Sequence, residues 1–408
     1  MPLDSLAKQI VDVDSHEMIP AGLWGDAFGE SGALLSALWQ SSPATSAATD
    51  LNSLVVDVSK DDLPIDPDSV WGHKGWLSGC SAPGAIDMQR RVEVLDFMGV
   101  QKQLVFPTGP VAGLVLLIAS TEFLSTLFGS DVDPALFQSE MAQDLARNVV
   151  RAWNDWTIRQ AKDGSSRLRP VAMLLPNKLD ELMAEAERLI DGGVRAFMLP
   201  ASVPPAGKSP ADRALAPFWS LCEKANVPVL LHIAAENFLQ TIVWRDVPEI
   251  MGSANGSASA EFLLDPWSFA VSHMAPESYI SSMILGGVFE RHPELRFGVL
   301  ECGAHWIAPM AQNLDTWANM FSHRMKGVIS MKPSEYVRRN IRVTAFSFEP
   351  VETYIEGSEM DDVYCYASDY PHVEGGKNQL EVFSEKVTPL GMDVTEKFFV
   401  RNGSFLIP

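Results

Sequence analysis

Cysteine is scarce in this sequence, and the few cysteines present are not paired in any recognisable motif. Cys80, Cys222, Cys302 and Cys365 are scattered over 408 residues, with no C-x-x-C spacing among them. Nothing in this spacing predicts a disulfide framework. Most of these residues lie inside apolar runs, so we expect buried, reduced thiols. A cytoplasmic location fits this pattern.

Long uninterrupted apolar segments are also missing. The most hydrophobic stretch, residues 111–128, is broken by Glu122 and by three hydroxyl-bearing residues. It is better explained as a buried or interface helix than as a membrane span. Residues 1–9 contain no apolar core of the signal-peptide type. We therefore predict no membrane partner, and we expect a homodimer because the 111–128 segment needs cover.

Basic residues are much fewer than acidic residues. The chain has 31 basic and 52 acidic residues, which gives a formal net charge of −21. This excess disfavours nucleic acid and anionic membranes as partners, because both are polyanions. A small anionic substrate is not excluded, since a local cationic pocket can oppose the overall field. The 47% hydrophobic and 20% charged residues are typical of an ordinary soluble protein.

What the sequence does contain is a series of eight short apolar runs, most of them followed by a helical pattern. Nearly continuous hydrophobicity of this kind is typical of strands buried on both faces of a parallel sheet. Eight strand–helix alternations predict an α/β protein with a (β/α)₈ TIM barrel, formed by residues 1–408 as a single domain. The absence of a G-x-G-x-x-G motif after an early strand weakens the Rossmann alternative. The expected strands are 9–14, 102–107, 168–175, 194–199, 227–232, 295–301, 341–345 and 363–368.

The intervening segments divide into helices and insertions. A long insertion, about residues 20–85, follows the first strand, and loops at 200–210 and 252–260 follow later strands. Because all of them come after strand ends, we place them on the C-terminal rim of the barrel. Helical spacing of apolar residues predicts helices at 86–98, 180–190, 212–225, 278–290 and 304–325.

Metal-binding side chains stand at the ends of three expected strands. Asp14 and His16 lie two residues apart at the first strand end, so their side chains point the same way. His232 ends the fifth strand, and Asp369 follows the eighth. Two imidazoles and two carboxylates suit a divalent ion such as Zn²⁺ or, alternatively, Mn²⁺.

Each of these residues also has an ordinary structural explanation. Asp14 could cap the following turn, His232 could be a satisfied buried histidine, and Asp369 could be a turn aspartate. The coincidence of ligands at three strand ends favours the metal site, because those ends meet at one rim of a barrel.

Several ordered motifs resemble the amidohydrolase superfamily. They are Asp12-Val13-Asp14-Ser15-His16, Leu231-His232, the tract 286–297, Glu301-Cys302-Gly303-Ala304-His305-Trp306 and Ala367-Ser368-Asp369-Tyr370-Pro371-His372. Within the superfamily they are similar to the branch that includes aminocarboxymuconate-semialdehyde decarboxylase. This resemblance implies a (β/α)₈ barrel with one divalent ion held by Asp14, His16, His232 and Asp369. No lysine ends the fourth strand, where binuclear relatives carry a bridging one, so a single metal is favoured.

One position departs from the branch. Its decarboxylases usually have an acid/base histidine at the end of strand six, where this chain has Glu301. Glu301 could be the acid/base, an extra ligand, or a residue that orients a metal-bound histidine. His273 is an alternative proton donor, although it could simply be a loop or capping histidine.

The resemblance implies a metal-dependent carboxy-lyase that acts on an aromatic or unsaturated carboxylic acid, with Asp369, Glu301 and His273 as catalytic candidates. A metal-dependent hydrolase that uses the same site is the first alternative, and a catalytically silent barrel is the second. Arg245 could pair with a substrate carboxylate. Rim aromatics could form an apolar pocket for a small planar substrate; they are Trp71, Trp76, Trp244, Trp267, Phe269 and Trp306.

Overall fold

The computed structural model covers most of the expected barrel. It describes residues 3–41, 61–72, 79–119, 124, 133–176, 178–233, 242–245, 247–251, 266–372 and 375–408. Trp76, His73 and the expected loop at 252–260 lie outside the described residues, as does most of the segment 41–70.

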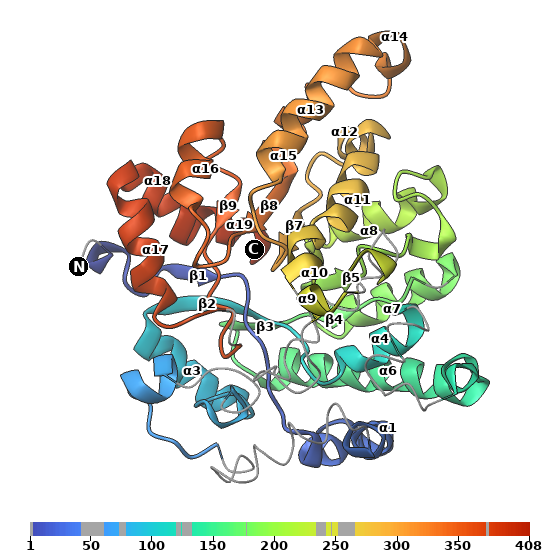
Figure 1. The fold of residues 1–408 in the computed structure, drawn as a ribbon, viewed down its shortest axis with the longest axis vertical. Helices are drawn as coiled ribbons and strands as arrows, with labels where there is room; N and C mark the ends of the chain where they lie inside the picture. The colour runs from blue at the N-terminus through green and yellow to red at the C-terminus, as the bar shows by residue number, and fades with distance from the viewer. Residues whose placement is uncertain are drawn as a thin grey trace.

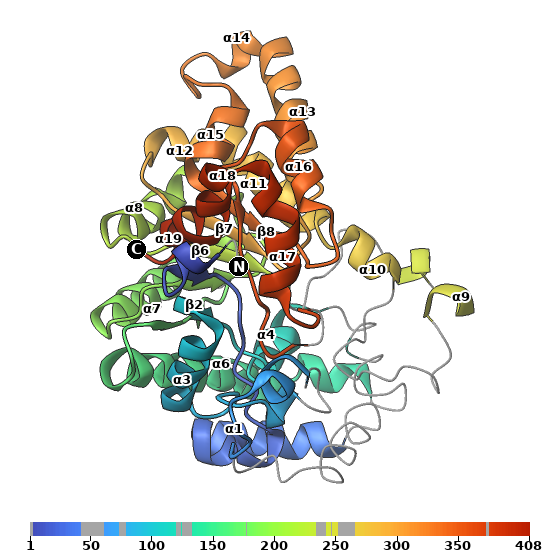
Figure 2. The ribbon, with the colours of Figure 1, turned by 90° about the vertical axis from the view of Figure 1, so that its left-hand side faces the viewer.

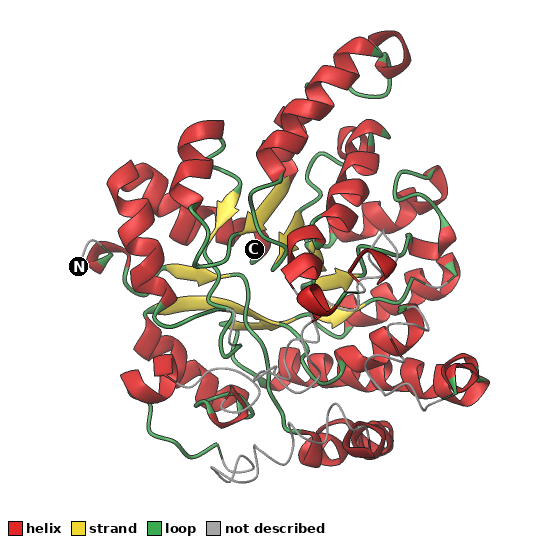
Figure 3. Ribbon diagram, viewed as in Figure 1, coloured by secondary structure: helices red, strands yellow, loops and turns green. Residues whose placement is uncertain are grey.

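Short parallel strands form the centre of the molecule, and helices surround them (Figures 1 and 3). The sheet order is β1-β2-β3 in one sheet and β4-β5-β6-β7-β8-β9 in the other, and neighbouring strands are parallel in both. All eight expected runs contain strand. Most strands are shorter than their runs, whereas β2 is as long as its run and begins two residues before it. The strands are β1 Ile10–Asp12, β2 Val100–Val105, β3 Leu168–Pro170, β4 Ala172–Met173, β5 Phe197–Leu199, β6 Val229–His232, β7 Phe297–Leu300, β8 Ile341–Thr344 and β9 Tyr364–Cys365.

Two junctions connect the sheets into a ring. The expected strand 168–175 is split at Val171, so that β3 pairs with β2 while β4 pairs with β5. At the other junction, Val13 N donates to Tyr366 O at 3.2 Å, and Ser15 forms an isolated parallel bridge with Tyr370. The first and last strands are therefore joined by individual hydrogen bonds rather than by a regular ladder. The fold is the predicted α/β TIM barrel, (β/α)₈.

The helices pack around the strands on the outside of the barrel (Figure 2). They are α1 Trp24–Ser41, α3 Met88–Met98, α4 Val111–Ile118, α6 Glu140–Asp163, α7 Leu179–Asp191, α8 Ala216–Lys224, α9 Pro248–Met251, α10 Pro266–Val271, α11 Met274–Leu285, α12 Val288–Arg291, α13 Ile307–Met320, α14 Ser322–Met325, α15 Pro333–Asn340, α16 Val351–Ser358, α17 Gln379–Val387, α18 Met392–Glu396 and α19 Asn402–Leu406.

Two of the expected helices are interrupted. The segment 278–290 belongs to α11 and α12, which are separated at Gly286-Gly287, where Gly287 has a φ of 68°. The segment 304–325 forms α13 and the short α14, with a break at Phe321. Apolar residues keep their helical spacing across both breaks, so periodicity alone did not reveal them. The expected stop of α3 at Gly99 is confirmed, since Gly99 adopts the left-handed conformation of a helix C-cap.

The described part of the apolar segment 111–128 is covered within the chain. Helix α4 lies against α6, and a Cβ at Gly113 would come within 2.9 Å of Ala146 O and of a Val149 methyl carbon. This close approach buries most of α4. Among the described residues, no helix combines the length and hydrophobicity that crossing a bilayer requires.

Candidate metal centre

The first strand carries two candidate ligands just beyond its end. Asp14 and His16 are buried, and His16 Nε2 lies 3.6 Å from Asp14 Oδ1. The backbone around them is held on both sides, because His16 N donates to Tyr370 O and Glu17 N donates to Phe106 O. The two side chains meet on the same side of the chain, as their spacing predicted.

His232 approaches the same point from the end of β6. Its Nε2 lies 3.2 Å from Asp14 Oδ1, and its ring stacks on Phe106 with centroids 4.3 Å apart. Its Nδ1 lies 2.6 Å from Ile233 O, a distance that fits donation of an Nδ1 proton to this carbonyl. That tautomer leaves the Nε2 lone pair directed toward Asp14 and available to a metal.

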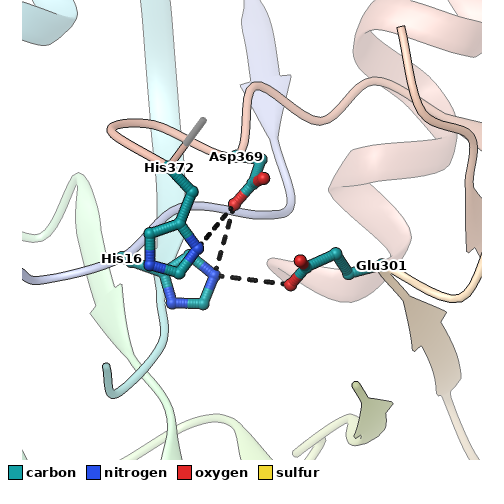
Figure 4. Close-up of side chains that lie close together, drawn as sticks. All are labelled: His16, Glu301, Asp369 and His372. Atoms are coloured by element: carbon teal, nitrogen blue, oxygen red, sulfur yellow. Dashed lines mark ion pairs between the residues drawn. The ribbon is translucent and has the colours of Figure 1, made fainter. Parts of the chain in front are cut away.

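Two further carboxylates enter from the ends of β7 and β9. His16 Nε2 is 3.8 Å from Glu301 Oε2 and 3.4 Å from Asp369 Oδ1, as Figure 4 shows. Glu301 Oε2 is also 3.2 Å from His232 Nε2. Both carboxylates sit on backbone with positive φ, 55° at Glu301 and 50° at Asp369. Such conformations are uncommon for residues other than glycine and cluster at functional sites.

His372, the last residue of the tract 367–372, also belongs to this cluster. Its ring stacks on His16 with centroids 3.7 Å apart, and its Nδ1 lies 3.2 Å from Asp369 Oδ1. On the other side, its Nε2 lies 3.1 Å from Thr108 Oγ1. Its position three residues after Asp369 in one short tract was the only sequence signal for this placement.

Burial and pairing set the charge states of the cluster in opposite directions. Burial lowers the pKa of His16 well below its usual value, and the neighbouring His372 adds to this effect. Burial alone raises the pKa of Asp14, but pairing with His232 outweighs it and brings the pKa below the usual range. For His232, burial lowers the pKa, and the pair with Asp14 more than compensates. The lowered pKa favours the neutral form of His16, in which imidazole binds a metal.

The donor set fits a single divalent ion. Both ring nitrogens of His16 are buried, and neither makes a hydrogen bond with the described residues. The possible ligand atoms fall into two groups that share His16, each within 4.8 Å: Asp14, His16 and His232; and His16, Glu301, Asp369 and His372. A cavity of about 20 Å³ is lined by Asp14, Glu301 and Asp369 among others, which is room for roughly one water or one ion. Mixed nitrogen and oxygen donors suit Zn²⁺ or Mn²⁺.

Other candidate residues have different surroundings. His273 precedes α11, and its ring meets that of His305 with centroids 4.7 Å apart, while its Nε2 lies 3.8 Å from Glu277 Oε2. Its contacts within the described residues are thus away from the metal cluster. Arg245 is buried and donates to Ser268 Oγ at 2.7 Å.

The predicted rim aromatics divide between the interior and the surface. Trp306 is buried and donates to Gly303 O, so it is a core residue, whereas Trp244 is 68% exposed. Phe269 packs edge-on against Phe346, one of the residues that line the metal-site cavity.

Comparison with known proteins agrees with this architecture. An amidohydrolase from Mycobacterium avium subsp. paratuberculosis has 18% identity and a TM-score of 0.61, with 81% of this chain and 77% of that chain covered. A 5-carboxyvanillate decarboxylase from Sphingomonas paucimobilis has 15% identity and a TM-score of 0.55 over 98% of both chains. A dihydroxybenzoic acid decarboxylase from a Polaromonas species, solved with manganese and 2-nitroresorcinol, has 16% identity and a TM-score of 0.56, covering 98% and 96%.

The sequence comparisons identify the family. No curated protein sequence matches the chain. The sequence model described as amidohydrolase matches residues 129–403, which is most of the chain and includes β6, β7, β8 and β9 with four of the clustered side chains, His232, Glu301, Asp369 and His372. The chain therefore belongs to the amidohydrolase family and is a metal-dependent enzyme.

Proposed function

We propose that this protein is a metal-dependent carboxy-lyase that removes CO₂ from an aromatic or unsaturated carboxylic acid without oxidation. The observation that carries the proposal is the buried cluster at the barrel mouth, where Asp14, His16, His232 and Asp369 converge beside Glu301. Decarboxylases of aromatic acids among the structures with the same fold support this choice of reaction.

The four ligands that we propose are Asp14, His16, His232 and Asp369. Two imidazoles suit Zn²⁺, while the carboxylate-rich surroundings and the manganese in the Polaromonas decarboxylase favour Mn²⁺ as the alternative. The bound ion would orient the substrate carboxylate, and would stabilise negative charge on an oxygen attached to the unsaturated system.

The chain's own residues would supply the proton and the orientation. Glu301 is the proposed acid: its proton goes to the carbon that bears the carboxylate. The C–C bond then breaks, its electron pair returns to the unsaturated system, and CO₂ leaves. His372, stacked on His16 and close to Asp369, would fix the orientation of both. Phe346, beside the cavity, offers an apolar face to a planar substrate.

The test is CO₂ release from a panel of hydroxybenzoic acids by the purified protein loaded with Mn²⁺ or with Zn²⁺. We expect turnover with at least one ortho-hydroxy acid, and its loss in Asp369→Asn.

The alternative function, a hydrolase, has its own support in the family assignment and in Glu301, which takes the place of the histidine that related decarboxylases usually have. Hydrolysis would incorporate solvent ¹⁸O into the product, whereas decarboxylation would not. A chain that retains no stoichiometric divalent ion would instead favour a silent barrel.

We also propose a homodimer in a reducing compartment such as the cytoplasm. All four cysteines are buried thiols, which fits such a compartment. The segment 111–128 lends a dimer little support, because α6 covers the described part of it. The exposed apolar side chains of Trp317, Met320 and Phe321 support a dimer instead.

A further inference from the structure

A second buried polar cluster lies next to the candidate ligands, and the proposed chemistry does not use it. At its centre is Asp12, the last residue of β1, which is fully buried. Asp12 Oδ1 accepts from Asp14 N at 3.3 Å and from Ser368 N at 2.9 Å. Asp12 Oδ2 accepts from Ser368 Oγ at 2.6 Å and from Gln103 Nε2 at 2.7 Å.

The hydrogen bonds continue from Gln103 to a buried cation. Arg91 Nη1 donates to Gln103 Oε1 at 3.3 Å, and Arg91 Nη2 donates to His16 O at 2.6 Å. The guanidinium also lies over the ring of Tyr370, 4.8 Å from its centroid. One connected network therefore reaches the backbone of Asp14, of His16 and of the residue before Asp369.

This network spans the junction where the barrel has no regular ladder. Asp12 and Ser368 are 356 residues apart in the chain, and they join the end of β1 to the segment that follows β9. Asp12 accepts a hydrogen bond from the backbone N–H of Asp14 itself, and Asp369 directly follows Ser368, which also donates to Asp12. A shift of either segment would move a ligand oxygen relative to His16.

We propose that Asp12, acting through Ser368 and Gln103, is a positioning residue that sets the spacing of Asp14 and Asp369 for the ion. This inference rests on the proposed metal-dependent function and adds a group that holds ligands without touching the metal. Loss of such supporting hydrogen bonds typically weakens metal binding about 10- to 100-fold.

The chain offers a matched pair of substitutions as a test. Asp12→Asn keeps the size of the side chain but directs an amide N–H at Gln103 Nε2, so that two donors face each other. Adding Gln103→Glu restores an acceptor opposite Asn and places the carboxylate beside Arg91. We expect Mn²⁺ affinity, measured by chelator competition, to fall about 10- to 100-fold in the single variant and to recover in the double variant. The visible spectrum of the Co²⁺-loaded protein should change and recover in parallel.

The thermal midpoint of each metal-free variant separates a loss of folding from a loss of positioning. If Asp12→Asn does not fold, Ser368→Ala removes only one hydroxyl and should weaken Mn²⁺ binding by a smaller factor. Unchanged Mn²⁺ affinity in these variants, with a wild-type chain that binds the ion tightly, would overturn the positioning role alone. A wild-type chain that binds neither Mn²⁺ nor Zn²⁺ would instead refute the proposed function, and this inference with it.

Discussion

The position of Glu301 fits both a proton donor and a metal ligand. Its Oε2 lies 3.2 Å from His232 Nε2 and 3.8 Å from His16 Nε2, so position alone does not separate the two roles. Replacement by glutamine keeps the shape and removes the titration. If Glu301 is the acid, Glu301→Gln should lower kcat about 10²- to 10⁴-fold and remove one limb of the pH–rate profile.

Metal affinity provides the control for this prediction. If Glu301 is the acid, the Glu301→Gln variant should bind Mn²⁺ about as tightly as the wild type. If Glu301 is a ligand, the substitution should weaken Mn²⁺ binding as well as turnover. An unchanged pH–rate profile would rule out the acid role. Asp369→Asn, measured in parallel, should lose affinity in either case because Asp369 is a proposed ligand.

Glu17 gives a prediction for stability rather than for catalysis. It accepts hydrogen bonds from Ile19 N and Thr108 N, yet burial raises its pKa from 4.5 to about 7. Between these values the unfolded chain has released its proton while the folded chain retains it, so rising pH favours unfolding. Glu17→Gln should remove this pH dependence. Relative to the variant, the wild type should lose up to about 3 kcal/mol in its free energy of unfolding between pH ~4.5 and ~7. Urea unfolding of both metal-free proteins across this window measures it, and parallel curves would contradict it.

Strand-end patterns were enough to nominate Asp14, His16, His232 and Asp369, because each of these candidate ligands stands at or just after the end of an apolar run. His372 was not recognised, since its stacking on His16 depends on two segments far apart in sequence. The partners of Asp12 could not be foreseen for the same reason. Hydrogen bonds over long separations leave no periodic trace in a sequence.

At the level of elements, the break between α11 and α12 depends on Gly287. Its φ of 68° is costly for any other residue, and an added Cβ would meet Val328 O at 2.4 Å. Gly287→Ala should therefore lower the free energy of unfolding by about 1 to 3 kcal/mol. Gly357, inside α16, has nothing within 4 Å of its added Cβ, so Gly357→Ala should be neutral or stabilising by up to about 1 kcal/mol. Equal effects in chemical denaturation would contradict this account.

The same comparison explains which elements could be predicted. Continuous apolar runs located all of the strands, because burial on both faces imposes that composition. Most strand lengths were overestimated, since residues such as Val13 and Tyr366 remain buried and hydrogen-bonded outside any regular ladder. The helix breaks were not predicted, because the helical spacing of apolar residues continues across them.

For the whole molecule, the most prominent feature is the arm formed by α13 and α14, which projects from the barrel (Figure 1). Trp317, Met320 and Phe321 on this arm are 52%, 70% and 42% exposed, and the two aromatic rings stack on each other. Exposed basic residues lie nearby, at Arg324 and Lys326. On a chain of net charge −21, an exposed apolar arm with two basic side chains would suit contact with acidic residues of a second copy, and we expect such complementarity at a dimer interface.

This complementarity makes the homodimer a specific prediction. The wild-type chain should sediment as a dimer, and Trp317→Ser combined with Phe321→Ser should give a monomer at the same concentration, because the central apolar contact is lost. Leu34, which is 55% exposed on α1, serves as the control: Leu34→Ser should leave the dimer intact. A monomeric wild-type chain, or a double variant that remains dimeric, would exclude the arm as the interface.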